Sequence, residues 1–168
     1  LELFTRGNTY CTINSVEDIN TIIEFTKGTN KKVYSHLKFD TGMTRMGAPY
    51  KEYKQIIDML SSINNIITKG LFSHFADADS NSNEFMDIQL ERFNIVKDYA
   101  KTKLQDLEYL HIANSATILK GYSHKGNTVR PGISLYGINP LGQINENLRP
   151  VMTFSAPITG VKTVKKGD

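Results

Sequence analysis

Four residues with titratable or cationic side chains each stand at the end of a predicted strand. They are Lys38, His74, His111 and Arg130. In a barrel of parallel strands, the side chains near the carboxyl ends of the strands build the active site, so we expect these four to converge there. Taken singly, each has a plainer interpretation: a lysine with its tip in water, or a histidine that is hydrogen-bonded in the core.

The sequence lacks the motifs of several common kinds of site. The turn glycines Gly42, Gly47, Gly132 and Gly137 have no phosphate-binding pattern of Walker or GxGxxG type around them. No spacing of His and Cys indicates zinc, and no GxSxG nucleophile motif occurs. We therefore predict no metal site and no serine hydrolase.

The elements that must position these residues alternate between helix and strand. Ser15 and Asp18 form an N-terminal capping signal, and apolar residues follow at helical spacing until Gly28. Between Val33 and Asp40, apolar and polar residues alternate, which predicts a strand with one polar face. We expect further helices at about 49–62, 85–99 and 115–120, and strands at about 69–75, 109–112 and 128–130.

This order predicts an α/β fold with parallel strands, because the connections are too long for hairpins. The alternatives are an open doubly wound sheet and a (β/α)8 barrel of TIM type, and the strand-end residues favour part of the barrel. From Pro150 to Lys166, apolar residues alternate with no helix between them. We expect a partial barrel over 1–149 and the first strands of a C-terminal all-β domain over 150–168.

Composition describes an ordinary soluble globular chain, with 39% hydrophobic and 22% charged residues. Its scattered basic residues and net charge of +3 give little reason to expect a nucleic-acid partner. Cys11 is the only cysteine, so no internal disulfide can form, and a cytoplasmic location fits.

No apolar run reaches the roughly 18 residues that cross a bilayer. Because Leu1 stands in place of methionine and the last stretch stops in a predicted strand and turn, we expect a fragment of a longer protein.

Four segments of the sequence, in this order, closely resemble the alanine racemase family. They are HLKFDTGMTRMG at 36–47, SHFADAD at 73–79, HIANSA at 111–116 and VRPGISLYG at 129–137. The first and last are highly specific to that family. The resemblance implies an enzyme of fold type III that uses pyridoxal 5'-phosphate (PLP), with an N-terminal (β/α)8 barrel and a C-terminal β domain. It also implies a homodimer whose active sites mix residues of both subunits.

The resemblance assigns roles to the cationic residues and the histidines. In the family, the lysine matching Lys38 is often carboxylated and holds the arginine matching Arg45. That arginine binds the substrate carboxylate, to which a guanidinium offers two parallel donors. Arg130 matches the arginine that donates a hydrogen bond to the pyridine nitrogen of PLP. His74 and His111 resemble the histidines that orient this arginine. Since a guanidinium does not readily give up its proton, the ring nitrogen would stay unprotonated and PLP would be a weaker electron sink.

Four residues match the family's phosphate cradle: Asn114, Ser115 and the backbone N–H groups of Gly132 and Ile133. Donors at the start of a helix suit a dianionic phosphate, and the late loops of a barrel are its usual location. Without the resemblance, Asn114 and Ser115 would be interpreted as a helix cap.

Two residues of the family have no match here. The Schiff-base lysine lies on the first barrel strand in a motif resembling AVVKANAYGHG, which is absent from this sequence. The opposing catalytic tyrosine follows the stretch that matches Thr163 to Asp168. Neither role is carried onto any lysine or tyrosine of this chain.

The resulting expectation is a parent protein that interconverts L- and D-alanine on PLP, with one base on each face of the α-carbon, and so supplies D-alanine for peptidoglycan. A racemase for serine or another amino acid is an alternative, because most residues that would select the side chain lie outside this sequence. A non-catalytic PLP-binding barrel is another, although the β-domain start after Pro150 argues against it. The chain alone would be inactive.

Overall fold

A computed structural model describes residues 1–167 and shows a parallel sheet with helices packed against it. The strands β1 (Cys11–Ile13), β2 (Val33–Asp40), β4 (Ile66–Phe72) and β5 (Tyr109–His111) lie side by side in that order, and β3 (Ala48–Pro49) pairs with β2. Each of these pairings is parallel. The prediction of parallel strands is therefore confirmed.

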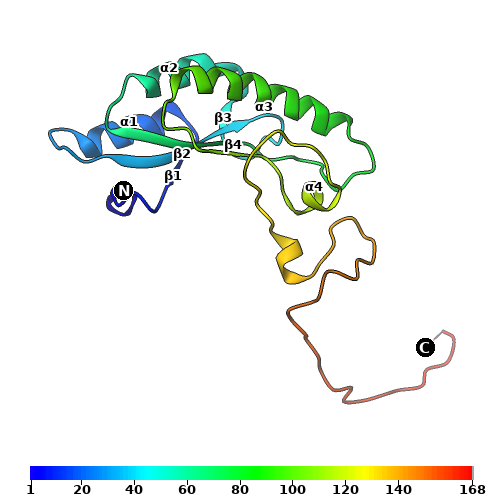
Figure 1. Cartoon of the computed structure of the whole chain (residues 1–168). Coiled ribbons are helices and arrows are strands. Elements are labelled where there is room, and N and C mark those ends of the chain that lie inside the picture. The colour runs from blue at the N-terminus through cyan, green and yellow to red at the C-terminus, as the bar shows by residue number, and fades with distance from the viewer. Residues whose placement is uncertain (168) are drawn as a thin grey trace.

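Among residues 1–167, three α-helices lie between strands: α1 (Val16–Thr26), α2 (Tyr53–Ser61) and α3 (Glu84–Lys103). A short helix, α4 (Ser115–Leu119), follows β5. Short 3-10 helices occupy Glu2–Thr5, Tyr50–Glu52 and Ile133–Tyr136. Figure 1 shows α2 and α3 running next to each other along one face of the sheet. Within residues 1–167, no helix is both long enough and apolar enough to cross a bilayer.

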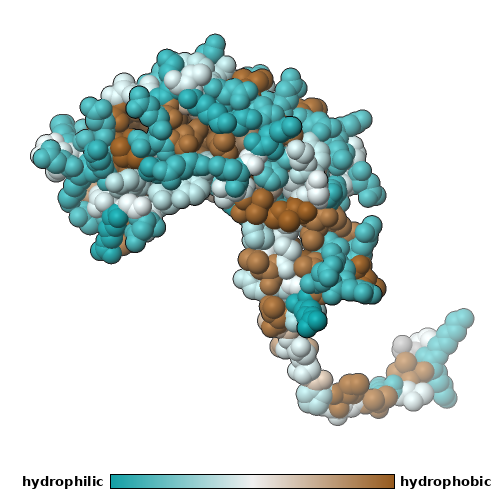
Figure 2. Space-filling view, in the orientation of Figure 1, coloured by the Kyte–Doolittle hydropathy of each residue, from teal (hydrophilic) through white to brown (hydrophobic). Residues whose placement is uncertain are grey.

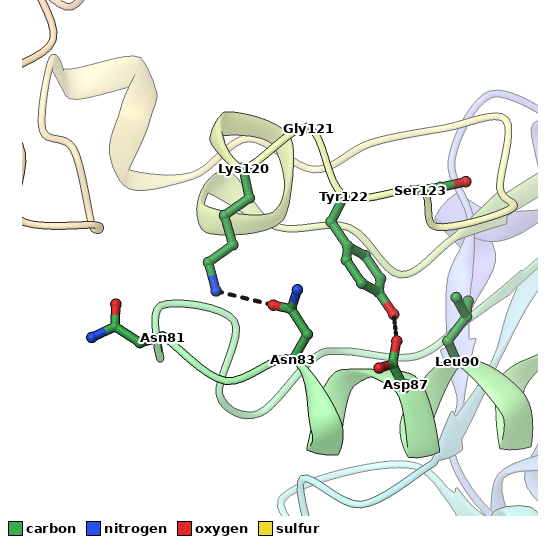
Figure 3. Close-up of a pocket in the computed structure, with 8 residues that line it drawn as sticks. All are labelled: Asn81, Asn83, Asp87, Leu90, Lys120, Gly121, Tyr122 and Ser123. Atoms are coloured by element: carbon green, nitrogen blue, oxygen red, sulfur yellow. Dashed lines mark hydrogen bonds between the residues drawn. The ribbon is translucent and has the colours of Figure 1, made fainter.

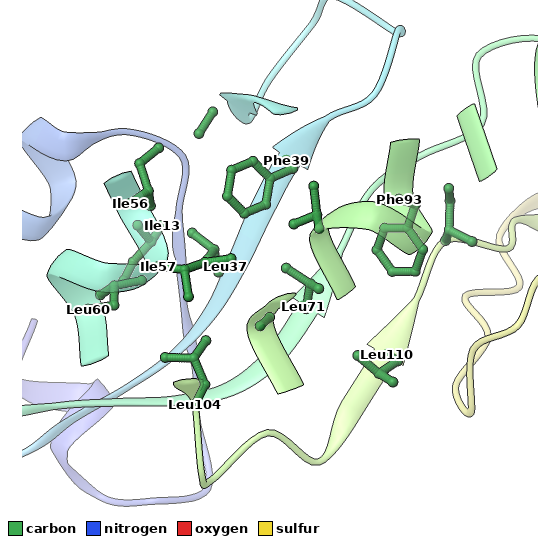
Figure 4. Close-up of a cluster of buried hydrophobic side chains, with 14 of the residues drawn as sticks. Ile13, Leu37, Phe39, Ile56, Ile57, Leu60, Leu71, Phe93, Leu104 and Leu110 are labelled. Carbon is green, nitrogen blue, oxygen red and sulfur yellow. The ribbon is translucent and has the colours of Figure 1, made fainter. Parts of the chain in front are cut away.

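The hydrophobic core lies between this face of the sheet and the helices. Leu37 and Phe39 of β2 and Leu71 of β4 are fully buried, and they face Ile57 of α2 and Phe93 of α3 (Figure 4). Successive side chains of a strand point to opposite faces. The alternation in β2 therefore leaves His36 and Lys38 on the other face of the sheet, while Ser35 is buried on the core face.

The strand register arranges this second face in rows. Lys38 pairs with Phe72, Phe72 pairs with His111, and a single bridge joins His111 to Thr128. The strand predicted over 128–130 is thus reduced to this one bridge. A neighbouring row, nearer the strand N-termini, holds His36, Gly70 and Tyr109.

The third predicted strand lies a few residues earlier than expected. β4 runs from Ile66 to Phe72 rather than over 69–75, because the apolar residues that follow the turn at Asn65 already pair with β2. Beyond it, the Ser73 N–H donates to the His111 carbonyl. His74 consequently lies on the loop after the strand and not at its last position.

Residues after about 137 leave the sheet as an extended segment, drawn orange to red in Figure 1. Residues 150–167 form no strand, and Phe154 and Ile158 are 93% and 84% exposed. Apolar surface follows much of this segment in Figure 2. The strands predicted from Pro150 onward are therefore not observed within residues 1–167, where no neighbouring strand is available to pair with them. A domain boundary near 150 stays a prediction.

Candidate functional site

Arg130 is the centre of the polar face of the sheet. Its Nη2 donates to the Ser73 carbonyl at 2.7 Å and lies 3.3 Å from His74 Nδ1. Its Nη1 donates to the His111 carbonyl at 3.2 Å and contacts His111 Nδ1. The structure thus brings together three of the four residues that were expected to converge.

Both histidines are neutral at physiological pH. Burial, followed by the positive charge of Arg130, lowers the pKa of His111 to about 3 and that of His74 to about 4. Burial lowers the pKa of Arg130 to about 10, so the guanidinium remains protonated at neutral pH. Because an arginine can only donate, each histidine offers Nδ1 to it as an acceptor.

Lys38, the fourth expected residue, lies next to this cluster across the ring of Phe72. Lys38 Nζ is 5.5 Å from the ring centroid, and Arg130 Cζ is 5.1 Å from the same centroid. The His111 ring stacks on Phe72 at 4.7 Å. Sequence reasoning overlooked Phe72, although its place in the register between Lys38 and His111 could have indicated it. Burial, followed by the charges of Arg45 and Arg130, lowers the pKa of Lys38.

Arg45 lies on a tight loop after β2 and is exposed. The loop turns at Asp40, whose Oδ1 accepts the N–H groups of Gly42 and Thr44 at 2.8 and 3.1 Å. It returns at Gly47, where φ is +116° and a Cβ would come within 2.9 Å of the Asp40 nitrogen, so only glycine fits. The motif therefore holds Arg45 close to Lys38.

A buried amide joins this loop to the loop that carries His74. Gln89 of α3 is fully buried; its Oε1 accepts the Ala76 N–H at 2.9 Å. Its Nε2 donates to Thr41 Oγ1 at 3.2 Å and to the His74 carbonyl at 2.9 Å. Thr41 also bonds Ser73 through their hydroxyls at 2.7 Å. Sequence reasoning missed Gln89, because helical periodicity does not distinguish a buried polar residue from a solvated one.

A pocket of about 310 Å³ opens beside Arg130. Six of the seven residues proposed for cofactor binding line it; they are His74, Asn114, Ser115, Arg130, Gly132 and Ile133. Ser115 Oγ accepts the N–H groups of Gly132 and Ser134 at 2.8 and 3.3 Å. Asn114 Oδ1 accepts the Thr117 N–H at 3.1 Å and so caps α4, as the plainer interpretation held.

A larger pocket, of about 680 Å³, lies between α3 and the segment after α4 (Figure 3). Several of its polar side chains bond across it: Tyr122 contacts Asp87, and Lys120 contacts the Ser80 carbonyl and Asn83. These contacts tie the end of α4 to α3. We therefore interpret this pocket as a gap between two segments that are held together by these bonds. It contains none of the predicted site residues.

The site therefore combines three cationic groups with two neutral histidines. None of the ion pairs found within residues 1–167 involves Lys38, Arg45 or Arg130. Arg130 lines the pocket, as does Asp79, and Asp40 acts on Lys38 with the opposite charge. Guanidinium groups suit carboxylates and phosphates. The fold and site define an α/β protein of parallel strands whose cationic side chains gather at the carboxyl ends of its strands.

Comparison with known proteins gives the family. The family model for the alanine racemase N-terminal domain matches residues 1–140. Alanine racemase of Carboxydothermus hydrogenoformans is 39% identical over 140 residues, which are 82% of this chain and 38% of that protein. That of Clostridium tetani is 34% identical over 171 residues, covering 99% of this chain and 44% of that protein. The chain belongs to the alanine racemase family.

Solved structures agree with this assignment. An alanine racemase of Clostridium difficile 630 superimposes with a TM-score of 0.77 at 31% identity, over 89% of this chain and 40% of that one. One from E. faecalis gives a TM-score of 0.71 at 31% identity, over 90% and 40%. The parallel sheet is accordingly part of a TIM-type barrel. The chain spans about two fifths of the length of the relatives it matches.

Proposed function

We propose that this chain forms part of an alanine racemase and that the polar face of its sheet binds PLP and the substrate carboxylate. The observation that carries the proposal is the arrangement around Arg130. Its two terminal nitrogens are held by two carbonyls and two histidines, while no hydrogen bond within residues 1–167 uses its Nε–H. One oriented donor therefore remains for a ligand next to the pocket.

These residues fit PLP. When bound, PLP supplies an electron-withdrawing ring that stabilises negative charge at the α-carbon of an amino acid. Arg130 would donate to the ring nitrogen and, with its pKa of about 10, would keep its own proton. His74 and His111 hold the guanidinium in place as neutral acceptors. An alanine racemase of Bartonella henselae has been solved with covalently bound pyridoxal phosphate, and its structure matches this chain with a TM-score of 0.69 at 29% identity.

The other end of the pocket would bind the phosphate. The N–H groups of Gly132 and Ser134 already converge on a single oxygen, that of Ser115. Backbone donors and a hydroxyl of this kind suit phosphate oxygens, and to bind one they would have to turn from the Ser115 oxygen to the phosphate. We assign Asn114 and Ile133 to the same cradle, with the Asn114 oxygen kept for capping α4.

Arg45 would bind the substrate carboxylate, since it is exposed and close enough to Lys38 for its charge to lower the pKa of that lysine. A carboxylated Lys38 would become an anionic partner for Arg45. The two bases that remove and return the α-proton would come from outside this chain, as would part of the homodimeric site. We further propose L- and D-alanine as substrates, a role in peptidoglycan precursor supply and a cytoplasmic location; serine is the alternative substrate.

The test compares D-alanine formation from L-alanine by the full-length protein with PLP. Arg130→Ala should abolish most activity and weaken PLP binding, while Arg6→Ala, an exposed arginine away from the site, should change neither. Equal activity of the two variants would contradict the proposal.

The 168-residue chain alone is a second test. With added PLP it should form no more D-alanine than PLP alone, because losing each proton-transfer group typically removes a factor of roughly 10² to 10⁴. An excess that disappears in Arg45→Ala would show that the bases lie within this chain.

A further inference from the structure

A third histidine extends the contacts of Arg130 deeper into the sheet. His36 Nδ1 lies 3.1 Å from His111 Nε2, and Arg130 contacts the opposite nitrogen of the same His111 ring. The three side chains therefore form a continuous chain from β2, through β5, to the pocket. The sequence placed His36 on the polar face of its strand and at the start of the first family-like segment, but assigned it no role.

The direction of these hydrogen bonds follows from Arg130. A guanidinium only donates, so His111 Nδ1 accepts and the proton of the neutral ring sits on Nε2. That N–H must then donate to His36 Nδ1, which places the proton of His36 on its own Nε2. This last atom is buried and has no hydrogen-bond partner within residues 1–167.

The environment of His36 keeps its ring in one place. Its ring stacks with Tyr10 at 4.7 Å and with Tyr109 at 5.5 Å. Across the strand, Gly70 leaves the space that the ring fills, because a Cβ there would lie 2.5 Å from His36 Cγ. Any larger residue at this position would displace the imidazole. The ring is closely fitted, and the bond of Nδ1 to His111 is the hydrogen bond that it makes within residues 1–167.

We propose that His36 is a positioning residue: by accepting the His111 N–H, it fixes the orientation of His111 and so aims the guanidinium of Arg130 at the pocket. The proposal rests on the proposed function only where cofactor binding is the readout. The rival explanation is that His36 merely fills space between two tyrosines.

Two substitutions separate these explanations. His36→Asn keeps an acceptor oxygen near the position of Nδ1 but loses the ring, whereas His36→Phe keeps a stacking ring but has no acceptor. Positioning predicts that the asparagine variant retains the native arrangement and the phenylalanine variant does not. Space filling predicts the reverse. Ser35→Ala, on the opposite face of the same strand, controls for general weakening of β2.

The direct measurement is the ring ¹⁵N spectrum of the chain, which has four histidines. We expect neutral Nε2–H forms for His36 and His111 at pH 7. In His36→Phe, the His111 Nε2–H loses its acceptor, so the His111 signals should shift or split as the ring leaves its single orientation, and they should do so in Gly70→Ala as well. In His36→Asn and Ser35→Ala they should stay in place. A proton on Nδ1 of His36, or an unchanged His111 in the phenylalanine variant, would overturn the proposal.

Cofactor binding gives the second readout. In the full-length protein, His36→Phe should weaken PLP binding by about tenfold, the loss expected for one misplaced hydrogen bond to a charged group, while His36→Asn should stay within about twofold. PLP affinity that is lower in the asparagine variant than in the phenylalanine variant would favour space filling and refute positioning. If Arg130→Ala leaves PLP affinity unchanged, the proposed function fails, but the ring spectra still decide the role of His36.

Discussion

Replacing Gln89 by methionine should weaken the site from a distance. Methionine has nearly the same length and no polar atoms, so the substitution removes the three hydrogen bonds of the amide and little volume. The Ala76 N–H and the His74 carbonyl would each lose a partner. At about 1 kcal/mol for each bond, the free energy of unfolding should fall by about 3 kcal/mol.

Urea unfolding measures this loss. With an m-value of about 2 kcal/mol/M, the midpoint should fall by about 1.5 M with no change in slope. Gln105→Met makes the same chemical change at an exposed position and should stay within about 0.5 kcal/mol of the original. Equal midpoints for the two variants would refute a structural role for the Gln89 network. Because this network holds the loops of Arg45 and His74, PLP affinity of the full-length protein should fall in parallel with stability.

Three further predictions concern the charged groups. The folded pKa values of His74 and His111, about 4 and 3, lie below the ordinary 6.5. The free energy of unfolding should therefore be highest above about pH 6.5 and should fall at lower pH, by at most about 2 kcal/mol per histidine at pH 5. A flat urea midpoint between pH 7 and 5 would contradict these values. A depressed Lys38 pKa raises the share of neutral amine that can add carbon dioxide, so ¹³C-bicarbonate should give a carbamate signal that Lys38→Arg lacks, and Lys38→Ala should lose activity. In the full-length protein, Arg130→Glu should slow racemisation and change the absorbance of bound PLP, because a carboxylate favours protonation of the ring nitrogen; an unchanged rate and spectrum would count against Arg130 as its partner.

The fold was predictable wherever local pattern and tertiary environment agree. Alternation in β2 indicated both its strand and its polar face, since one side packs on helices and the other does not. The capping pair Ser15 and Asp18 placed the start of α1 correctly. The pattern was less informative at β4, where Thr68, Lys69 and Gly70 interrupt the apolar residues and leave the strand ends undefined. From Pro150 onward, alternation alone did not produce strands, because a strand requires a neighbour to pair with.

Prediction of the site depended on the motifs. They identified Arg130, His74 and His111, and the structure brings these residues into contact. The roles of these residues stay predictions. Periodicity could not reveal Gln89 or His36, because their importance comes from partners that are distant in sequence: His36 meets His111 across 75 residues. Such contacts depend on strand register, which the sequence specifies only through the whole sheet.

Arg130 also constrains the order in which the molecule can form. Its guanidinium bonds the carbonyl of a residue 57 positions earlier and another 19 positions earlier, on the ends of two adjacent strands. The loop that follows it is fastened to Ser115. The bond to the Ser73 carbonyl joins the segment after β5 to the end of β4, and loop closure over 57 residues is entropically unfavourable until the pairing of β4 with β5 offsets it. Ligand-binding competence should therefore arise in one of the last folding steps, after most of the sheet is protected from hydrogen exchange, and a chain released early from synthesis would have a core but no site.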